Sequence, residues 1–206
     1  MKNAPEQQHK TNKADTAPLK NIFSENPLLS LGLAVSPAVL YANTVENALI
    51  LSAVITVLSF FSVMVSSFIP RRIVFTSRVI LYTLIGALMF VPIYILFWWF
   101  FPEKANSMGI IAPLLITNPF IISLSEHRFY KEPRGKMTVD LTTSLLGYDA
   151  AVLVFAFIRE LFSEGGIGGR IFGIEHTVTG LAYPFGGFIL IGLLAAALRC
   201  ASSHRK

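Results

Sequence analysis

The sequence has little charge for its length. Only 14% of its 206 residues are Asp, Glu, Lys or Arg, whereas 53% are hydrophobic and the mean hydropathy is +0.61. A soluble domain carries about 25% charged residues. Here charge is missing from long stretches and is concentrated in short clusters between them. Because a membrane-spanning helix needs about 20 consecutive apolar residues, this distribution predicts an integral membrane protein and excludes a soluble enzyme.

Other features of soluble proteins are also missing. The single cysteine, Cys200, can form no disulfide within the chain, so we interpret it as a free thiol in a reducing compartment. The polar first 20 residues lack the apolar segment of a signal peptide and predict a disordered tail. The glycine run at 165–169 follows an apolar helix, so it is interpreted as a flexible outer loop rather than a phosphate-binding loop. The four histidines are isolated and have no metal-ligand spacing.

The sequence does contain six apolar segments, at about residues 27–43, 48–69, 79–101, 108–124, 139–162 and 181–198. The third ends in the aromatic cluster 97–101, which is typical of a membrane interface. Six crossings would put both termini on one side. Most basic residues fall on that side, and only Lys104, Arg159 and Arg170 fall on the other. The positive-inside rule therefore predicts both termini in the cytoplasm.

The first and fourth segments are short and contain proline, at Pro37 and at Pro113 and Pro119. Each opens one half of the chain and is followed by two longer segments. Because three crossings is an odd number, the second half would be inverted relative to the first. Paired broken segments point to a central site at the repeat interface, although proline is also simply common in membrane helices.

The predicted fold is therefore all-α and integral to the membrane, with six transmembrane helices in two inverted three-helix repeats. The first helix of each repeat is short or broken. A single membrane domain is expected at residues 25–200, between a disordered cytoplasmic tail at 1–24 and a short cytoplasmic tail at 201–206.

Ionisable residues at membrane depth are costly and are functional candidates by default. Glu46 is either a cation or coupling residue or a loop carboxylate near the outer surface. Asp149 is either a cation or proton site or a hydrogen-bond partner of a neighbouring helix. Asp140 is interpreted as a helix cap. Arg159 and Glu160 are adjacent, so they point in different directions; they are interpreted as an interfacial pair that snorkels, with Glu160 also a candidate coupling residue.

Uncharged polar residues lie at membrane depth as well. The amide of Asn118 needs a partner there, either backbone freed by Pro119 or another subunit. Hydroxyl groups line the second segment at partly helical spacing, which favours a role in helix packing; they belong to Ser52, Thr56, Ser59, Ser62, Ser66 and Ser67.

A series of short motifs, in order and at matching spacing, resembles the Rnf/Nqr membrane-subunit family. The motifs span residues 25 to 169 and include Glu25-Asn26-Pro27, Glu46-Asn47-Ala48-Leu49, Phe68-Ile69-Pro70, Phe101-Pro102-Glu103, Gly109, Pro113-Leu114, Asn118, Asp140, Gly147 and Ile158-Arg159-Glu160-Leu161. Cytoplasmic termini make the chain more similar to the RnfE/NqrD-like branch than to the oppositely oriented RnfA/NqrE branch.

This resemblance implies a subunit of a bacterial inner-membrane complex that couples electron transfer to the translocation of Na⁺ or H⁺. It implies pairing with a homologous subunit and contact with other complex subunits. It also implies an iron–sulfur cluster, held within the membrane by cysteines from the two broken helices of each of the two paired subunits.

At the cysteine positions the sequence departs from the family. Ser36-Pro37 replaces a Cys-Pro, and Asn118-Pro119 replaces an Asn-Cys. Serine is a poor substitute for a thiolate, and a proline side chain is no ligand. We therefore expect this chain to carry no cluster ligands of its own. Two functions stay open: a membrane subunit of an Rnf/Nqr-type translocase, or a cluster-free paralogue acting as a non-redox carrier or scaffold. Neighbouring genes for flavin- or ferredoxin-binding subunits would favour the first.

Overall fold

The computed structural model describes residues 28, 32, 34–70, 72–116, 119–128, 134–168, 170–171 and 177–203. In this part of the chain nearly all regular structure is helical. The helices are α2 (Val35–Tyr41), α3 (Val45–Ser66), α4 (Phe75–Phe100), α5 (Pro102–Met108), α6 (Ile111–Leu114), α7 (Pro119–Ser123), the π-helical turn η1 (Leu124–Arg128), α8 (Arg134–Glu164), the 3₁₀ turn η2 (Thr179–Ala182) and α9 (Pro184–Ser203).

Three helices are long and apolar enough to cross a membrane. They are α3, α4 and the Gly135–Glu164 part of α8, whereas the apolar part of α9, Pro184–Ala197, is shorter. The expected first segment is represented by the short helix α2. The expected fourth segment is divided into α6 and α7, followed by η1.

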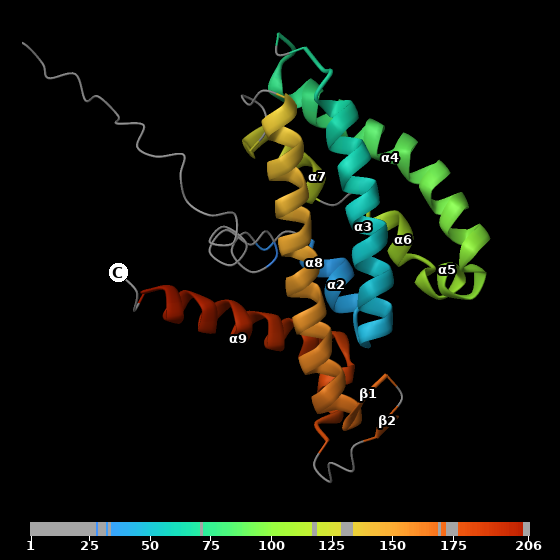
Figure 1. The fold of residues 1–206 in the computed structure, drawn as a ribbon, viewed down its shortest axis with the longest axis vertical. Coiled ribbons are helices and arrows are strands. Elements are labelled where there is room, and N and C mark those ends of the chain that lie inside the picture. Colours follow the sequence, from blue (N-terminus) through green and yellow to red (C-terminus); the bar gives the residue numbers. More distant parts are fainter. Residues whose placement is uncertain are drawn as a thin grey trace, which may run out of the picture.

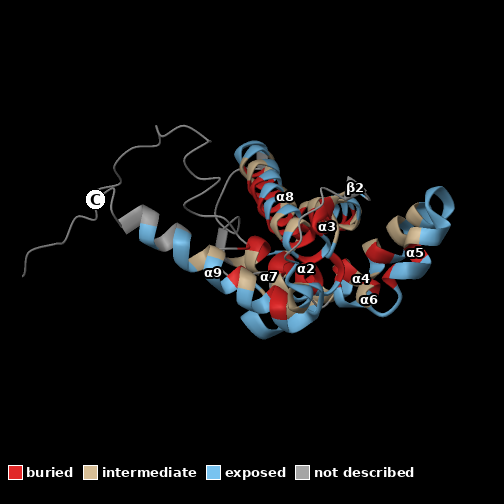
Figure 2. Ribbon diagram, turned by 90° about the horizontal axis from the view of Figure 1, so that it is seen from below, coloured by how far each residue is buried: buried red, intermediate tan, exposed pale blue. Residues whose placement is uncertain are grey.

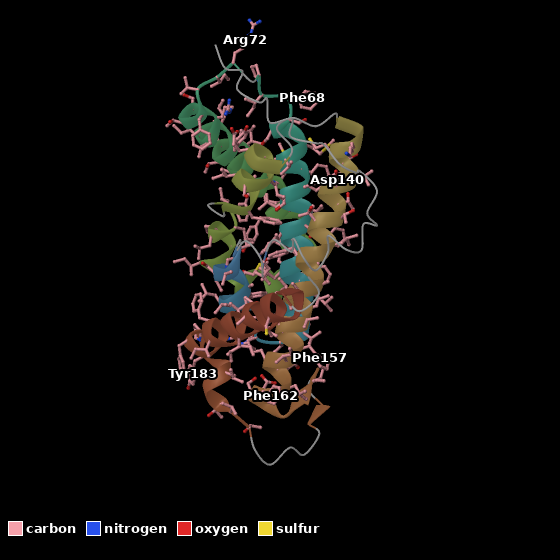
Figure 3. The ribbon with its side chains drawn as sticks, turned by 90° about the vertical axis from the view of Figure 1, so that its left-hand side faces the viewer. Phe68, Arg72, Asp140, Phe157, Phe162 and Tyr183 are labelled. Atoms are coloured by element: carbon pink, nitrogen blue, oxygen red, sulfur yellow. The ribbon has the colours of Figure 1, made fainter. Side chains whose placement is uncertain are left out.

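The helices α3 and α8 run side by side in opposite directions and form the axis of the molecule (Figure 1). Helix α4 leans away from this pair on one side, and α9 leaves it on the other (Figure 1). Phe68, Arg72 and Asp140 lie toward one end of the pair, and Phe162 and Tyr183 lie toward the opposite end (Figure 3). We call these the basic end and the hairpin end.

The core lies where α2, α3, α7 and α8 meet, and Figure 2 shows buried residues concentrated there. By contrast, α4 and α9 carry many exposed large apolar side chains, among them Leu84, Leu88, Phe188 and Leu193. Outward-facing apolar residues of this kind are what a lipid-facing helix requires.

Local chemistry explains where the long helices begin and end. The Thr44 hydroxyl caps α3 by accepting a hydrogen bond from the Asn47 amide at 3.2 Å, as an N-cap residue does. Pro70 follows the end of α3. The aromatic residues that close α4, including Trp98 and Trp99, are exposed, as an interface belt requires. Pro102 then starts α5 at the first helical position, where proline is favoured.

Two local expectations were wrong. Asp140 is not a cap, because α8 begins six residues earlier, at Arg134. The glycine run is not an irregular loop, because β1 (Gly166–Ile167) pairs antiparallel with β2 (Arg170–Ile171). Gly168, in the turn of this hairpin, has a φ of 59°, a left-handed conformation that glycine adopts without steric cost.

Candidate functional site

Two contacts set the register of the α3–α8 pair. The Glu160 carboxylate accepts a hydrogen bond from the Val45 amide, and the Asp149 carboxylate accepts one from the Thr56 hydroxyl. The contacts lie eleven residues apart on each helix, from 45 to 56 and from 149 to 160. The two helices therefore stay in one antiparallel register from the hairpin end to the middle of the bundle.

The Asp149–Thr56 contact lies near the middle of both helices. Thr56 Oγ1 is 2.9 Å from Asp149 Oδ1 and 2.8 Å from Oδ2, and neither side chain is fully exposed. The structure thus shows the interhelical hydrogen bond that was one of the two alternatives for Asp149. An ionised carboxylate has about four acceptor positions, so one hydroxyl leaves capacity for a cation.

Tyr148, the residue before Asp149, connects the two broken segments. Its side chain is fully buried, its hydroxyl donates to the Ala34 carbonyl at 3.3 Å, and its ring lies 5.1 Å from that of Phe120. Ala34 precedes α2, and Phe120 lies in the first turn of α7. Sequence reasoning missed Tyr148, although a tyrosine inside an apolar span was the available indication, because a buried hydroxyl normally needs a partner.

The positions at which the family resemblance expects cysteines lie beside these contacts. Ser36 is exposed and Pro37 is buried, both in α2, and Pro119 is the first residue of α7. Asn118 lies outside the described residues. The chain enters α2 through Ala34, whose φ of 57° is left-handed, a conformation that is strained for a residue with a Cβ. The starts of α2 and α7 both lie close to Tyr148 of α8.

The side chains near these positions do not match a cluster site. Ser36 offers a hydroxyl and Pro37 no donor, while Cys200 is exposed on α9. Within the described ranges, no group of three His, Cys, Asp or Glu side chains could hold a metal ion. Thiolates are the usual ligands of iron–sulfur clusters, so the donors in this part of the chain do not fit one.

Arg159 fixes the end of α2. Its side chain is 1% exposed. Nη1 donates to the Val39 carbonyl at 2.6 Å and to the Ala42 carbonyl at 3.4 Å. Nε and Nη2 donate to the carbonyls of Leu181 and Ala182 in η2, at 2.8 and 2.9 Å. A cation at the C-terminus of a helix satisfies free carbonyls and complements the helix dipole.

Glu160 binds backbone amides at the start of α3, whereas Arg159 binds backbone carbonyls at the end of α2. The Glu160 side chain is also 1% exposed. Oε2 accepts from the Val45 amide and Oε1 from the Gly168 amide, both at 2.6 Å. A carboxylate at a helix N-terminus pairs with free amides and with the positive end of the dipole. The adjacent pair therefore holds the turn between α2 and α3 from both sides, and we call it the Arg159–Glu160 clamp.

The clamp corrects the sequence interpretation. Both residues were expected to snorkel at the interface, but the structure buries both and pairs them with backbone groups. Close packing of α9 encloses the guanidinium. A Cβ on Gly187 would lie 2.9 Å from Val39 Cγ1 and 3.4 Å from Arg159 Cζ, so only glycine lets α9 approach this closely.

Glu46 lies at the hairpin end, in the first turn of α3. Its side chain is 67% exposed and pairs with Lys104 Nζ of α5 at 2.9 Å. The hydrogen bond to Glu46 raises the pKa of the Lys104 ammonium above its ordinary value. The structure therefore does not bring Glu46 together with Asp149; the Glu46 carboxylate is exposed and ion-paired with Lys104.

A second ion pair lies at the basic end. The Arg78 guanidinium of α4 is paired with both carboxylate oxygens of Glu126 in η1, and the Tyr82 hydroxyl donates to Glu126 Oε2 at 2.9 Å. Arg78 Nη1 also donates to the Ile73 carbonyl at 2.9 Å. Both ion-pair side chains are about nine-tenths buried. This group joins α4 of the first half of the chain to η1 of the second.

The different surroundings of Glu160 and Glu46 predict different effects of the same change. Glu160→Gln should lower the stability of the detergent-purified protein by about 2 kcal/mol, because the amide group can accept only at its single oxygen and places an NH₂ against a backbone donor. Glu46→Gln is the matched control and should change stability negligibly, since an exposed ion pair contributes little. Midpoints of thermal unfolding, measured side by side, check this. Equal midpoints for the two variants would contradict the clamp.

Comparison with known proteins identifies the family of this chain. The model of a family described as Rnf-Nqr subunit, membrane protein, matches residues 16–201. This chain belongs to the Rnf-Nqr membrane-subunit family. The match includes both broken segments, the Asp149–Thr56 contact and the clamp. Membership, together with the three long apolar helices, confirms the resemblance and the prediction of a multi-pass integral membrane protein.

Curated relatives cover most of the chain, and the three that follow are NqrD-type subunits of a Na(+)-translocating NADH-quinone reductase. The relative from Shewanella denitrificans is 32% identical over 155 residues, 75% of this chain and 71% of its own length. The relative from Pseudoalteromonas translucida is 27% identical over 202 residues, 90% of this chain and 94% of its own. The one from Shewanella baltica (strain OS155) is 27% identical over 189 residues, 86% of this chain and 88% of its own.

Proposed function

We propose that the chain is a membrane subunit of an Rnf/Nqr-type complex that couples electron transport to cation translocation, with Na⁺ as the cation. Family membership over residues 16–201 carries this proposal. The names of the relatives, which are subunits of a Na⁺-translocating NADH–quinone reductase, supply the cation and the reaction class. In this proposal the chain is a non-catalytic subunit that pairs with a related membrane subunit.

The proposed topology is six membrane segments in two inverted halves. It is supported by the opposite directions of α3 and α8, and by the short proline-containing helices that precede each of them (Figure 1). The last helices of the two halves, α4 and α9, lie on opposite sides of the central pair, with α9 running nearly across its axis (Figure 1).

Both termini are proposed to lie in the cytoplasm of a bacterial inner membrane. The basic end would then face the cytoplasm, because cytoplasmic loops carry an excess of Lys and Arg. Support comes from the basic residues at that end, among them Arg72, Arg78 and Lys136. The hairpin end, with its exposed tryptophans at the end of α4, would face outward.

Asp149 is the proposed cation-binding residue. An acidic side chain at the middle of a membrane-spanning pair is costly unless it has a partner or a function. Its contact with Thr56 supplies one partner. Glu46 and Glu160 are weaker candidates, since each already has an ammonium or two backbone amides as partners.

The chain is proposed to contribute no iron–sulfur ligands at its broken helices. This is supported by the serine and proline at the family's cysteine positions and by the exposed position of Cys200 on α9. The same observations favour a second candidate, a cluster-free paralogue that acts as a carrier or scaffold without redox chemistry.

One experiment separates the two candidates. The tagged chain is purified from its native membranes in mild detergent, and co-purifying subunits, iron content and the reduced-minus-oxidised EPR spectrum are measured. Flavoprotein subunits in the preparation are the expected result. If iron is present, its signal should persist in a Cys200→Ser variant, because the ligands would come from the partner subunits. A chain that purifies without redox subunits and without iron would support the carrier or scaffold instead.

A further inference from the structure

We propose that hydroxyl groups of α3 and η1 form a one-sided route along which a monovalent cation such as Na⁺ passes between Asp149 and the basic end. The route consists of Thr56, Ser59, Ser62, Ser66 and Ser125, and we call it the hydroxyl route. The inference rests on the proposed function, because it takes Asp149 as the place where the cation binds. It adds to the proposed function the end of the bundle from which the cation reaches Asp149.

The hydroxyls of α3 share one face of the helix. Steps of three or four residues from Thr56 to Ser59, Ser62 and Ser66 keep them within one stripe. The side chains of Ser62 and Ser66 are at most 5% exposed. Because α3 packs against both α8 and η1, this stripe is enclosed by protein rather than by lipid. At 1.5 Å per residue it covers about 15 Å from the centre of the membrane toward the basic end.

Two hydroxyls on this route are buried without a partner. In the described part of the chain, Ser62 Oγ and Ser125 Oγ have no hydrogen-bond partner although both are inaccessible to solvent. Native proteins pair nearly all such groups, and each exception calls for an explanation. Oxygen atoms are the ligands that hard cations prefer. Hydroxyls held free of other hydrogen bonds can therefore replace part of the water shell of a passing cation.

The other half of the α3–α8 pair is closed to a cation. Between Asp149 and the clamp, α8 buries the apolar side chains of Val152, Phe155 and Ala156. Beyond these residues lies the clamp, where backbone carbonyls take up the buried guanidinium of Arg159 and backbone amides take up the buried carboxylate of Glu160. The one hydroxyl on the corresponding part of α3, Ser52, donates to the Leu49 carbonyl of its own helix, as Ser66 of the route donates to the Ser62 carbonyl. The two halves therefore differ in the number of hydroxyls and in the unpartnered Ser62 and Ser125.

At the basic end the route meets a buried ion pair with no net charge. Ser125 is followed directly by Glu126, whose carboxylate is paired with Arg78 and accepts from Tyr82. The carboxylate offsets the guanidinium charge there, so a cation meets no net repulsion from this pair. Asp149 thus has hydroxyl oxygens on the side of the basic end, and buried apolar residues on the side of the clamp.

Cysteine labelling tests the direction of the route. In a Cys200→Ser background, Ser62→Cys and Ser52→Cys are a matched pair of buried serines on the two sides of Thr56. Membranes from cells that make the full complex are prepared inside-out and right-side-out, and each is treated with a small, membrane-impermeant, positively charged thiol reagent. Ser62→Cys should react from the cytoplasmic face on the order of 100-fold faster than from the outside, because a charged group is strongly disfavoured in the apolar interior. Ser52→Cys should react from neither.

Added NaCl, compared with choline chloride at equal concentration, should slow the labelling of Ser62→Cys. A second change, Asp149→Asn, should remove this protection while leaving the labelling itself. Equal labelling of Ser52→Cys and Ser62→Cys, or labelling of Ser62→Cys from the outside, would overturn the route. If Ser62→Cys does not accumulate, Ser125→Cys is used with the same expectations. One-sided labelling without Na⁺ protection would leave the route in place and contradict Na⁺ as the cation, so the two proposals can fail separately.

Discussion

Replacing Arg159 with methionine is expected to destabilise the protein by about 3–5 kcal/mol, a large effect for a single substitution. Methionine fills a similar length of the cavity but donates no hydrogen bond. The carbonyls of Val39, Ala42, Leu181 and Ala182 would all lose their donor. The carbonyls of Val39 and Ala42 cannot turn to water, because both residues are fully buried. Thermal unfolding of the purified protein in detergent measures the effect.

The control for this prediction is Arg72→Met. Arg72 is exposed in the loop between α3 and α4, so its replacement should leave the unfolding midpoint nearly unchanged. The unfolding midpoint of Arg159→Lys should fall between those of Arg159→Met and Arg72→Met, since lysine keeps the charge but reaches fewer carbonyls. Hydrogen exchange should show the loss first in α2 and in η2, which the guanidinium connects. An Arg159→Met protein with the midpoint of the Arg72→Met protein would show that the carbonyls find other partners.

The second large effect is expected on transport. Asp149→Asn should reduce Na⁺ translocation by the complex at least about tenfold, which corresponds to about 1.4 kcal/mol, without preventing assembly. The asparagine oxygen can still accept from Thr56, so the α3–α8 packing is kept. The negative charge that would attract a cation is lost. Uptake of ²²Na⁺ into membrane vesicles measures transport, and the amount of assembled complex in the same vesicles measures assembly.

Thr56→Val and Thr56→Ser form the matched pair for this test. Valine removes the only hydroxyl that the structure places on the Asp149 carboxylate within the described residues, whereas serine keeps it. Transport should fall in the valine variant and stay near the original level in the serine variant. Unchanged Na⁺ uptake in Asp149→Asn would remove Asp149 from the cation path, and with it the basis of the hydroxyl route.

The clamp and the central contact have a common structural basis. Arg159 and Glu160 fix the turn between α2 and α3, and Tyr148 and Asp149 contact the starts of α2 and α7 and the middle of α3. All four side chains come from α8. This helix therefore positions both broken segments, and changes on it should affect stability and transport in separable ways.

The sequence by itself determined that the protein is an integral membrane protein. Hydropathy is a property of composition over about 20 residues, so it needs no knowledge of which helix packs on which. The order and spacing of short motifs indicated the family, because motifs can also be compared without knowing which helix packs on which. The proline-broken segments could be found because proline interrupts a helix wherever it occurs.

Only the tertiary structure decided which polar residues have partners. Arg159 and Glu160 carry the same charges in the sequence whether they snorkel or are buried, and their burial depends on backbone groups 8 to 23 residues away as well as on groups of α2 and α3 more than 100 residues away. The same holds for Tyr148, whose partner Ala34 is 114 positions distant. The difference between Glu46, paired at the surface, and Glu160, buried on two amides, comes from long-range packing that no local pattern encodes.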